Sequence, residues 1–219
     1  MPAPNKPGSW SSALAVYSHP RVLGMMFLGF SAGLPLSLGF GNLITWLTEI
    51  RIPIAVVGMF TWISLTYALK VFLAPIVEMV NIPVLSRLLG HRRSWIMVAQ
   101  IGVAIGIYGL SSINPHLHLL WFAWFGLLLA FFGAIQDIVI DAYRIEVVSS
   151  DYQAAMASTY LFGYRFALVI SGAGVLLISE FTSWNTAYFS MAILMLVNII
   201  TTLVIKEPET RAARKSMPV

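Results

Sequence analysis

The sequence predicts an all-α integral membrane protein, and three observations support this fold class. Hydrophobic residues make up 58% of the chain and charged residues only 10%, whereas a soluble domain carries about 25% charged residues. Mean hydropathy over all 219 residues is +0.83. Apolar runs of about 20 residues, each long enough to cross roughly 30 Å of hydrocarbon as a helix, recur along almost the whole length. We therefore expect a multi-pass protein that lies in a lipid bilayer.

Six of these runs are expected to be transmembrane helices. Their approximate ranges are residues 22–48, 54–79, 94–113, 119–147, 154–179 and 184–205. Residues 1–20 are expected to form a short cytoplasmic arm, because they lack the basic, apolar and small-residue order of a cleavable signal peptide. Residues 208–219 are expected to form a basic cytoplasmic tail, so the membrane unit takes in residues 21–207.

Charged residues and proline set the limits of the first three helices. The first begins after Arg21 and ends before Arg51, and the second begins after Pro53 and ends beside Glu78. The third begins near the basic pair of HRRSW and ends before the proline of INPHLH. Proline and charge are both unfavourable inside a helix that crosses hydrocarbon, so they mark its ends.

The last three helices follow the same rule. The fourth runs through WFAWFGLLLAFFGAI, which carries no charge, into the charged segment QDIVIDAYRIE. The fifth begins near the polar segment SSDYQ and contains YLFGYRFALV. The sixth is closed by Lys206 and Pro208, since proline cannot continue a regular helix.

The lysine and arginine residues that flank the helices predict the orientation, because positive residues collect in cytoplasmic segments. With the amino terminus inside, the outer loops hold only Arg51. The cytoplasmic segments then hold Lys6, Arg21, Arg87, Arg92, Arg93, Arg144, Lys206, Arg211, Arg214 and Lys215. Both termini are therefore expected in the cytoplasm, and the net charge of +4 reflects orientation rather than binding to nucleic acid.

Several kinds of site are not indicated. The chain has no cysteine, which excludes disulfides and thiolate catalysis. His116 and His118 lie in an outer loop without a third ligand nearby, so they are expected to be polar loop residues rather than metal ligands. Asp137 and Asp141 lie along one helix, whereas an intramembrane aspartyl protease must bring its aspartates together from different helices. We therefore expect no metal, no cofactor and no enzymatic activity.

Four ionisable residues lie within the expected helices, where such groups usually face the bundle interior or a water-filled cavity. They are Lys70, Asp137, Asp141 and Arg165. Asp137 and Asp141 share one helix face, and Arg144 follows on the same side. We expect Asp137 to carry a proton. Two alternatives stay open: Asp141 and Arg144 form a structural ion pair, and the stem of Lys70 extends toward the lipid headgroups.

The first helix admits two interpretations. Gly29 and Gly33 form a small-xxx-small pair, which is typical of close packing against a neighbouring helix. Pro35 removes a helical hydrogen bond, and Asn42 offers a polar group further along, which is typical of a kinked, movable helix beside a cavity. The sequence does not choose between them.

Four segments resemble the AmpG muropeptide permeases of the major facilitator superfamily. They are GFSAGLPLSLGFGNLITWL, LGHRRSW, GAIQDIVIDAYRIEVV and YLFGYRFALVISGAG, and the resemblance runs from about Arg21 to Glu207. It implies a secondary transporter, driven by the proton gradient, that imports GlcNAc-anhydroMurNAc peptides across the bacterial inner membrane for cell-wall recycling. It also implies that the six helices form one half of such a transporter, built from two inverted three-helix repeats.

For an assembled transporter of this kind we expect the following site residues. The proton-coupling candidates are Asp137 and Asp141. The substrate-binding or counter-ion candidates are Arg165, Lys70, Gln136 and Asn42. The cytoplasmic gating loop takes in Glu78, Gly90, Arg92, Arg93 and Arg144, with Glu78 and Met79 standing where the superfamily usually has Asp-Arg. Helix flexibility is assigned to Gly29, Gly33 and Pro35.

The length of the chain departs from the resemblance. Such permeases have at least twelve helices in two halves, with the substrate held between them, whereas six are expected here. We expect a second six-helix half, either a separate polypeptide or a second copy, to cover the polar face. Two alternatives stay open: a transporter of acetyl-CoA or another anionic metabolite, whose phosphates suit Arg165 and Lys70, and a truncated fragment that does not transport.

Overall fold

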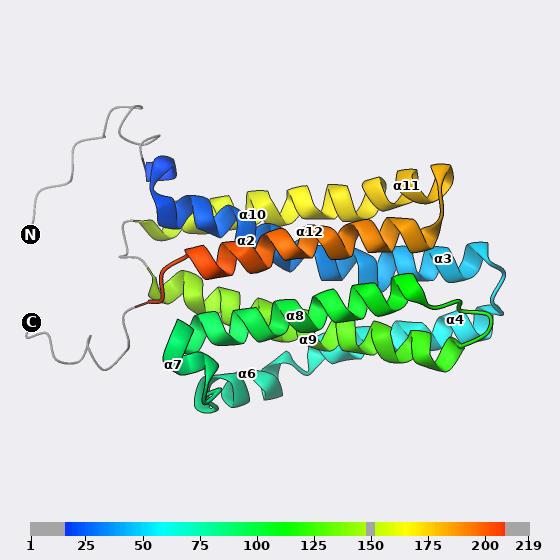
Figure 1. Ribbon diagram of the computed structural model, residues 1–219, viewed down its shortest axis with the longest axis horizontal. Helices are drawn as coiled ribbons and strands as arrows, with labels where there is room; N and C mark the ends of the chain where they lie inside the picture. Colours follow the sequence, from blue (N-terminus) through cyan, green and yellow to red (C-terminus); the bar gives the residue numbers. More distant parts are fainter. Residues whose placement is uncertain (1–15, 148–151, 209–219) are drawn as a thin grey trace, which may run out of the picture.

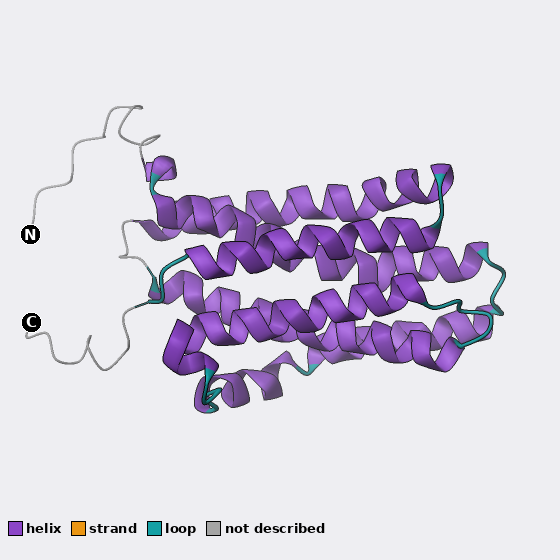
Figure 2. Ribbon diagram, viewed as in Figure 1, coloured by secondary structure: helices purple, strands orange, loops and turns teal. Residues whose placement is uncertain are grey.

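The computed structural model describes residues 16–147 and 152–208. Within these ranges the chain is a bundle of helices without a strand, and the long helices run side by side along one axis (Figure 1, Figure 2). Most of the expected amino-terminal arm (1–15) and most of the expected tail (209–219) lie outside the described residues.

Five continuous helical spans within the described ranges are long and apolar enough to cross a membrane. The first comprises α2 (Pro20–Ser37), the π-helical turn η2 (Leu38–Asn42) and α3 (Leu43–Glu49). The next two are α8 (His91–Ser112) and α9 (Leu119–Glu146). The last two are the span formed by α10 (Gln153–Val169), the π-helical turn η5 (Ile170–Gly174) and α11 (Val175–Phe181), and α12 (Trp184–Val204).

The second expected helix, residues 54–79, is not one straight helix. It comprises α4 (Ile54–Phe60), the 3₁₀ turn η3 (Thr61–Ser64), α5 (Leu65–Ala68) and α6 (Lys70–Met79). Its two parts meet at Leu69 with a bend of 46°. Thr61 and Ser64 donate side-chain hydrogen bonds to carbonyl oxygens three residues earlier (2.6 and 2.5 Å), and such bonds compete with regular helical bonding. Counted as one span, this bent pair brings the total to six, which confirms the predicted fold class.

The third span begins earlier than the sequence indicates. α8 starts at His91 rather than at residue 94, and a short helix, α7 (Leu85–Leu89), occupies the loop before it. Gly90 separates the two with a φ of 91°, a left-handed conformation that glycine adopts at little cost. The basic pair expected before the helix therefore lies in its first turn.

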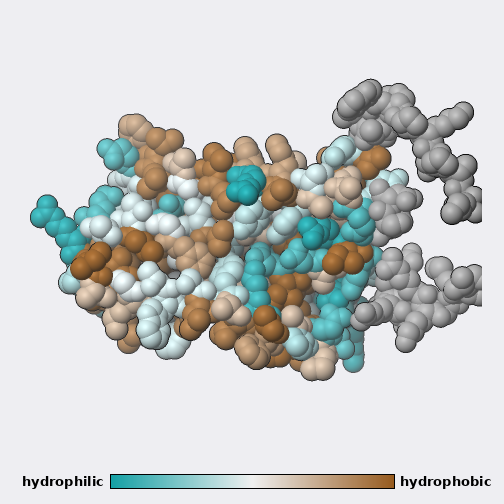
Figure 3. Space-filling view, turned by 180° about the vertical axis from the view of Figure 1, so that it is seen from behind, coloured by the Kyte–Doolittle hydropathy of each residue, from teal (hydrophilic) through white to brown (hydrophobic). Residues whose placement is uncertain are grey.

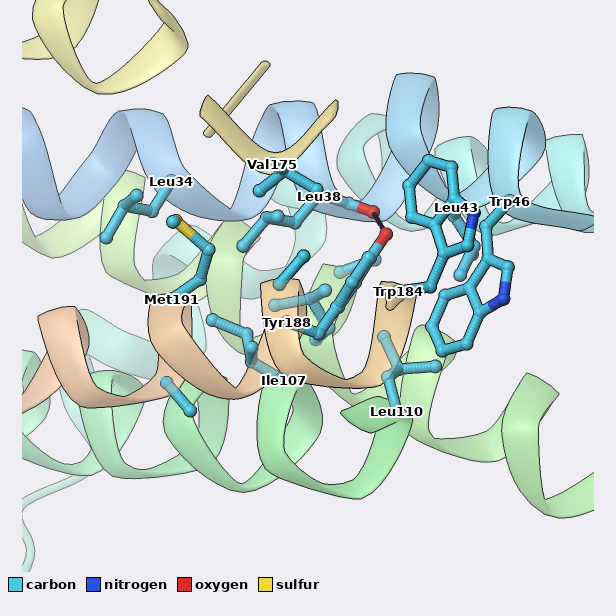
Figure 4. Close-up of a cluster of buried hydrophobic side chains, with 14 of the residues drawn as sticks. Leu34, Leu38, Leu43, Trp46, Ile107, Leu110, Val175, Trp184, Tyr188 and Met191 are labelled. Carbon is cyan, nitrogen blue, oxygen red and sulfur yellow. Dashed lines mark hydrogen bonds between the residues drawn. The ribbon is translucent and has the colours of Figure 1, made fainter. Parts of the chain in front are cut away.

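A large cluster of buried side chains joins α3, η2 and α12 (Figure 4). The rings of Trp46 and Trp184 stack with their centroids 5.8 Å apart. Tyr188 is fully buried and donates its hydroxyl hydrogen bond to the Leu38 carbonyl oxygen at 2.8 Å. A buried tyrosine hydroxyl normally needs such a partner, and this one lies in a π-helical turn.

Glycines bring α2 and α10 into close contact. A side chain at Gly29 would run into the Tyr160 carbonyl oxygen, and one at Gly33 would run into the Tyr164 carbonyl oxygen. Both glycines therefore lie where the two helices approach most closely, as the packing interpretation requires. The assignment of helix flexibility to these residues and to Pro35, which lies inside α2, stays a prediction.

The spans differ in how much of their surface the bundle covers. Only 22% of the apolar window of the α10–α11 span is buried, compared with 67% of the α8 window. The bent second span exposes Trp62, Phe72 and Met79. Figure 3 shows hydrophobic side chains over the middle of the molecule and hydrophilic ones gathered toward the end where the grey segments attach. The second and fifth spans therefore offer large surfaces for lipid or protein to cover.

Candidate functional site

Lys70 and Asp137 form an ion pair between the bent second span and α9. Their Nζ and Oδ2 atoms are 2.5 Å apart, and their side chains are 32% and 14% exposed. Lys70 is the first residue of α6, directly after the bend at Leu69. Moving charges out of water is costly unless they pair, so this contact explains how two ionisable residues are accommodated within the spans.

The surroundings of this pair contain unused hydrogen-bonding capacity. The Lys70 Nζ lies 4.7 Å from the centroid of the Tyr67 ring, within the range of a cation–π interaction. The Tyr67 hydroxyl and the Asp137 Oδ1 atom are buried, and neither has a hydrogen-bond partner among the described residues. Buried polar atoms are normally satisfied, so this site can accept a proton, a water molecule or a polar group of a substrate.

A second ion pair lies about one turn further along α9. Arg144 Nη2 is 3.4 Å from Asp141 Oδ1, and the arginine also lies over the Tyr160 ring of α10, 5.4 Å from its centroid. The rings of Tyr160 and Tyr164 are 6.0 Å apart. The structure thus contains the ion pair that the sequence left as an alternative for Asp141 and Arg144. Because Asp141 is 53% exposed, water screens this contact and its contribution to stability is small.

Arg165 lies on the exposed side of α10 and forms no ion pair with any described residue. Two roles were expected for it, counter-ion of Asp137 or clamp for a substrate. In this structure the counter-ion is Lys70 instead. Adjacent helical residues point about 100° apart, and Tyr160 and Tyr164, one turn apart, share the side of α10 on which Arg144 of α9 lies over the Tyr160 ring. Arg165 is consequently turned away from the pair and presents its charge outward.

Gln136 and Asn42, expected as substrate-binding or counter-ion residues, are buried in contacts between helices, and that role stays a prediction. They are 0% and 4% exposed. The Gln136 side-chain amide donates to the Ser31 hydroxyl of α2 at 2.9 Å, and the Asn42 amide donates to the Ser171 carbonyl oxygen of η5. Both amides lie inside the bundle and hydrogen-bond to a residue of another span. Each therefore connects two spans.

A buried polar network extends from Gln136 to two further spans, and the sequence analysis did not detect it. The Ser31 hydroxyl also accepts from the Gln100 amide of α8 at 3.1 Å, and Gln100 in turn accepts from the Thr202 hydroxyl of α12 at 2.8 Å. Hydrogen bonds between membrane helices contribute about 0.6–2 kcal/mol each. The network therefore connects α2, α8, α9 and α12.

Arg92 joins three helix ends through two carboxylates. Its Nη2 atom is 2.7 Å from Glu78 Oε2 and 2.7 Å from Glu146 Oε1, and its Nε atom donates to Glu146 Oε2 at 2.9 Å. The paired contacts with Glu146 have the bidentate form that makes arginine–carboxylate contacts strong. Although Glu78 lacks the arginine that usually follows in the superfamily pattern, its carboxylate binds a cation from the next span.

Glu207 connects the end of the chain's last span to the start of α8. Its two carboxylate oxygens accept from the backbone amides of Arg92 and Arg93 at 2.8 and 3.0 Å, where the helix N-terminus favours negative charge. The Arg93 guanidinium donates to two carbonyl oxygens in the last turn of α12. A side chain at Gly90 would collide with Glu207.

Four of the five expected gating-loop residues therefore lie together, and Arg144 does not lie with them. The sequence analysis missed Glu146 and Glu207 as members of this cluster. The sequence signal for them was their position, since each is a carboxylate at the end of a span close to a basic residue, Arg144 before Glu146 and Lys206 before Glu207. Local hydropathy, however, does not show which charged residues of different spans contact one another.

No protein-family model matches the chain, but individual relatives do. It is 35% identical over 196 residues to a Rickettsia conorii protein named putative transporter AmpG 4, a match that covers 89% of this chain and 47% of that protein. It is 32% identical over 199 residues to the anhydromuropeptide permease of Escherichia coli, covering 90% and 40%. A Haemophilus influenzae protein described as uncharacterized is 35% identical over 200 residues, covering 90% and 46%.

The chain spans less than half the length of these relatives. The sequence similarity nevertheless extends across almost all of the chain, which confirms the resemblance found in its motifs. The names of the first two relatives describe a transporter and a permease and not enzymes, in agreement with the expected absence of enzymatic activity. Together with the apolar spans, these relatives identify a membrane protein.

Proposed function

Because the chain is an AmpG-like permease sequence, homologous to these transporters over about 90% of its length, we propose that it is one half of a proton-coupled secondary transporter. The proposed substrates are muropeptides, GlcNAc-anhydroMurNAc peptides, imported across the bacterial inner membrane with both termini in the cytoplasm. The energy source is the proton gradient, without a bound cofactor. The name of the Escherichia coli relative supports the substrate class, and the positive-inside pattern supports the orientation.

The observation that carries the proposal is the ion pair between Lys70 and Asp137. A proton that neutralises Asp137 removes the charge that holds Lys70, and the ammonium group then becomes available to an anionic group of the substrate. A proton or a substrate shifts the equilibrium between the inward-open and outward-open conformations only if it binds one of them more tightly than the other. We assign this difference in affinity to the ion pair, because the Lys70 ammonium group binds either the Asp137 carboxylate or the substrate. Arg165 is assigned as a second, permanently charged clamp, since a guanidinium keeps its proton.

The proposal includes a second six-helix half. The chain aligns with only 40–47% of the length of its relatives, and the second and fifth spans carry the least covered surfaces. A charged side chain such as Arg165 costs about 2.5–3.5 kcal/mol on insertion scales when it faces lipid. When a second half, from another polypeptide or a second copy, covers this surface, the Arg165 side chain faces a shared aqueous pathway instead of lipid.

Uptake into sealed membrane vesicles tests the proposal. With radiolabelled muropeptide, we expect vesicles that contain the chain together with its covering half to accumulate substrate only when a proton gradient is imposed. Asp137→Asn is expected to abolish this accumulation while the protein still inserts into the membrane. The exposed Glu180 lies near the opposite end of the fifth span, and Glu180→Gln is the matched control that retains uptake. Undiminished gradient-driven uptake by Asp137→Asn removes Asp137 from the mechanism.

A second candidate is transport of acetyl-CoA or another anionic metabolite. The outward-facing Arg165 favours it, because phosphates bind arginine well. Competition separates the two functions: excess unlabelled acetyl-CoA lowers muropeptide accumulation only if the same site accepts it. A chain that transports neither compound, alone or with its covering half, is a fragment without transport activity.

A further inference from the structure

A lipid-sized groove lies between the first turns of α2 and the last turns of α12. Its volume is about 830 Å³. Apolar side chains from both helices form its walls: Leu23 and Phe27 on α2, and Val197, Ile200 and Val204 on α12. These side chains are 41–77% exposed among the described residues. The walls therefore suit an apolar chain that lies parallel to the helices.

The groove has two cations at its end. Arg21 and Lys206 both line it, and both lie outside the apolar part of their spans. Neither forms an ion pair with a described carboxylate. Arg21 uses one guanidinium nitrogen to donate to the Val147 carbonyl oxygen at 3.0 Å, and its other guanidinium nitrogens have no hydrogen-bond partner among the described residues.

Two other cations at the same end, Arg92 and Arg144, differ from Arg21 and Lys206, because carboxylates already bind them. Arg92 binds Glu78 and Glu146, and Arg144 binds Asp141. Arg21 and Lys206 thus add positive charge beside the groove that no described carboxylate binds.

Local contacts fix the geometry of this end. The Tyr143 hydroxyl of α9 donates to the Lys206 carbonyl oxygen at 2.8 Å. Glu207, the next residue, is held at the start of α8 by two backbone amides. Lys206 therefore has a fixed backbone position while its side chain stays exposed. An apolar groove with cations held at one end matches the two parts of a phospholipid.

We propose that this groove binds an anionic diacyl phospholipid, with the headgroup phosphate at Arg21 and Lys206 and an acyl chain along the walls formed by α2 and α12. The groove lies on two membrane spans, so lipid is the molecule that meets it directly. Basic pockets between transmembrane helices at the cytoplasmic side bind anionic headgroups in this way. The inference extends beyond the proposed transport function and does not depend on it.

Native mass spectrometry of the full chain, released from detergent micelles, tests the proposal. The probes are dioleoyl phosphatidylglycerol and dioleoyl phosphatidylcholine, which carry the same acyl chains and differ in headgroup charge. We expect tighter binding of phosphatidylglycerol by about five-fold for each contributing cation. The double variant Arg21→Gln/Lys206→Gln is expected to bind both lipids equally, and Arg21→Lys/Lys206→Arg is expected to retain the preference.

Arg87→Gln is the matched control, because Arg87 lies at the same end, in α7, and does not line the groove. It is expected to retain the full preference. Helix content, measured by circular dichroism for each variant, separates a loss of lipid binding from a loss of folding. If Arg21→Gln/Lys206→Gln unfolds, the charge-retaining variant Arg21→Lys/Lys206→Arg tests the site.

Three results overturn the proposal. Equal binding of the two lipids by the unaltered chain shows that the groove does not select charge. If Arg87→Gln loses the preference for phosphatidylglycerol as fully as Arg21→Gln/Lys206→Gln does, the preference comes from the overall positive charge at this end of the bundle and not from the groove. Displacement of the lipid by millimolar glycerol phosphate identifies a soluble phosphate site instead of a lipid site.

Discussion

At the scale of single residues, the placement of ionisable side chains depends on which partner the fold supplies. Lys70 and Asp137 are 67 residues apart in the chain and in direct contact in the bundle. Arg165, which is equally unusual in an apolar span, has no such partner among the described residues and points outward. Two cations that look alike in the sequence are therefore in different surroundings: Lys70 contacts a carboxylate, and Arg165 has no ion pair with any described residue.

The Lys70 and Asp137 pair yields a stability prediction. Lys70→Met leaves a largely buried carboxylate without its cation. Breaking a fully buried pair costs about 3–5 kcal/mol, but Lys70 is 32% exposed and water screens part of the interaction. We therefore expect a loss of about 1–2 kcal/mol, measured by denaturant unfolding in detergent micelles.

The double variant Lys70→Met/Asp137→Leu completes the test. It removes both charges, so we expect it to be more stable than Lys70→Met alone, which indicates coupling between the two sites. Arg144→Met is the control, because its partner Asp141 is well exposed and the change should cost no more than about 0.5 kcal/mol. Strictly additive losses at residues 70 and 137 contradict the pairing.

At the scale of secondary-structure elements, departures from regular helix occur where the first and fifth spans meet. η2 and η5 are both π-helical turns, and the Asn42 amide donates to the Ser171 carbonyl oxygen between them. Single π-helical turns are rare and frequently occur at functional sites. The bent second span adds a third irregular element, and Lys70 follows its bend directly.

Close packing of α2 against α10 gives a prediction about these elements. In Gly33→Leu the new side chain meets the Tyr164 carbonyl oxygen and the Ala167 side chain. Backbone atoms cannot move aside cheaply, so we expect a loss of about 1–3 kcal/mol or more, seen as a lower thermal transition in micelles. Gly41→Ala is the control from the same span, because nothing lies within 4 Å of the added atom. A fall in both variants by equal amounts shows that helix packing is not the cause.

At the scale of the whole molecule, two of the six spans, the second and the fifth, are poorly covered by the rest of the bundle. The second and fifth spans expose large side chains such as Phe72 and Phe162, which are 72% and 64% exposed. Lipid covers such a surface adequately where it is apolar, but Arg165 interrupts it on the fifth span. A second half that brings polar groups of its own accommodates that residue better than hydrocarbon.

Cysteine cross-linking tests where the second half binds. The chain has no cysteine, so Phe72→Cys or Phe162→Cys introduces a single reporter on the proposed interface. In membranes of the producing cells, the introduced thiol is labelled with a photoactivatable cross-linker, and we expect illumination of either variant to join it to a second helical half, seen as a larger species on a denaturing gel. Leu196→Cys places the reporter on α12, where Leu196 is 53% exposed, and should not cross-link. Cross-linking only at residue 196 places the interface on α12 instead.

The sequence by itself determined the membrane surroundings of this protein and the number and approximate limits of its spans, whereas for Gly29 and Gly33 it left close packing and helix mobility open. The properties that it determined are local, because hydropathy acts on each helix separately. Only the tertiary structure decided that Lys70 pairs with Asp137, that Gln136 and Asn42 connect helices, and that Glu207 binds the start of α8. Each of these contacts joins residues far apart in the chain, so it depends on how the helices rotate and bend when they pack together.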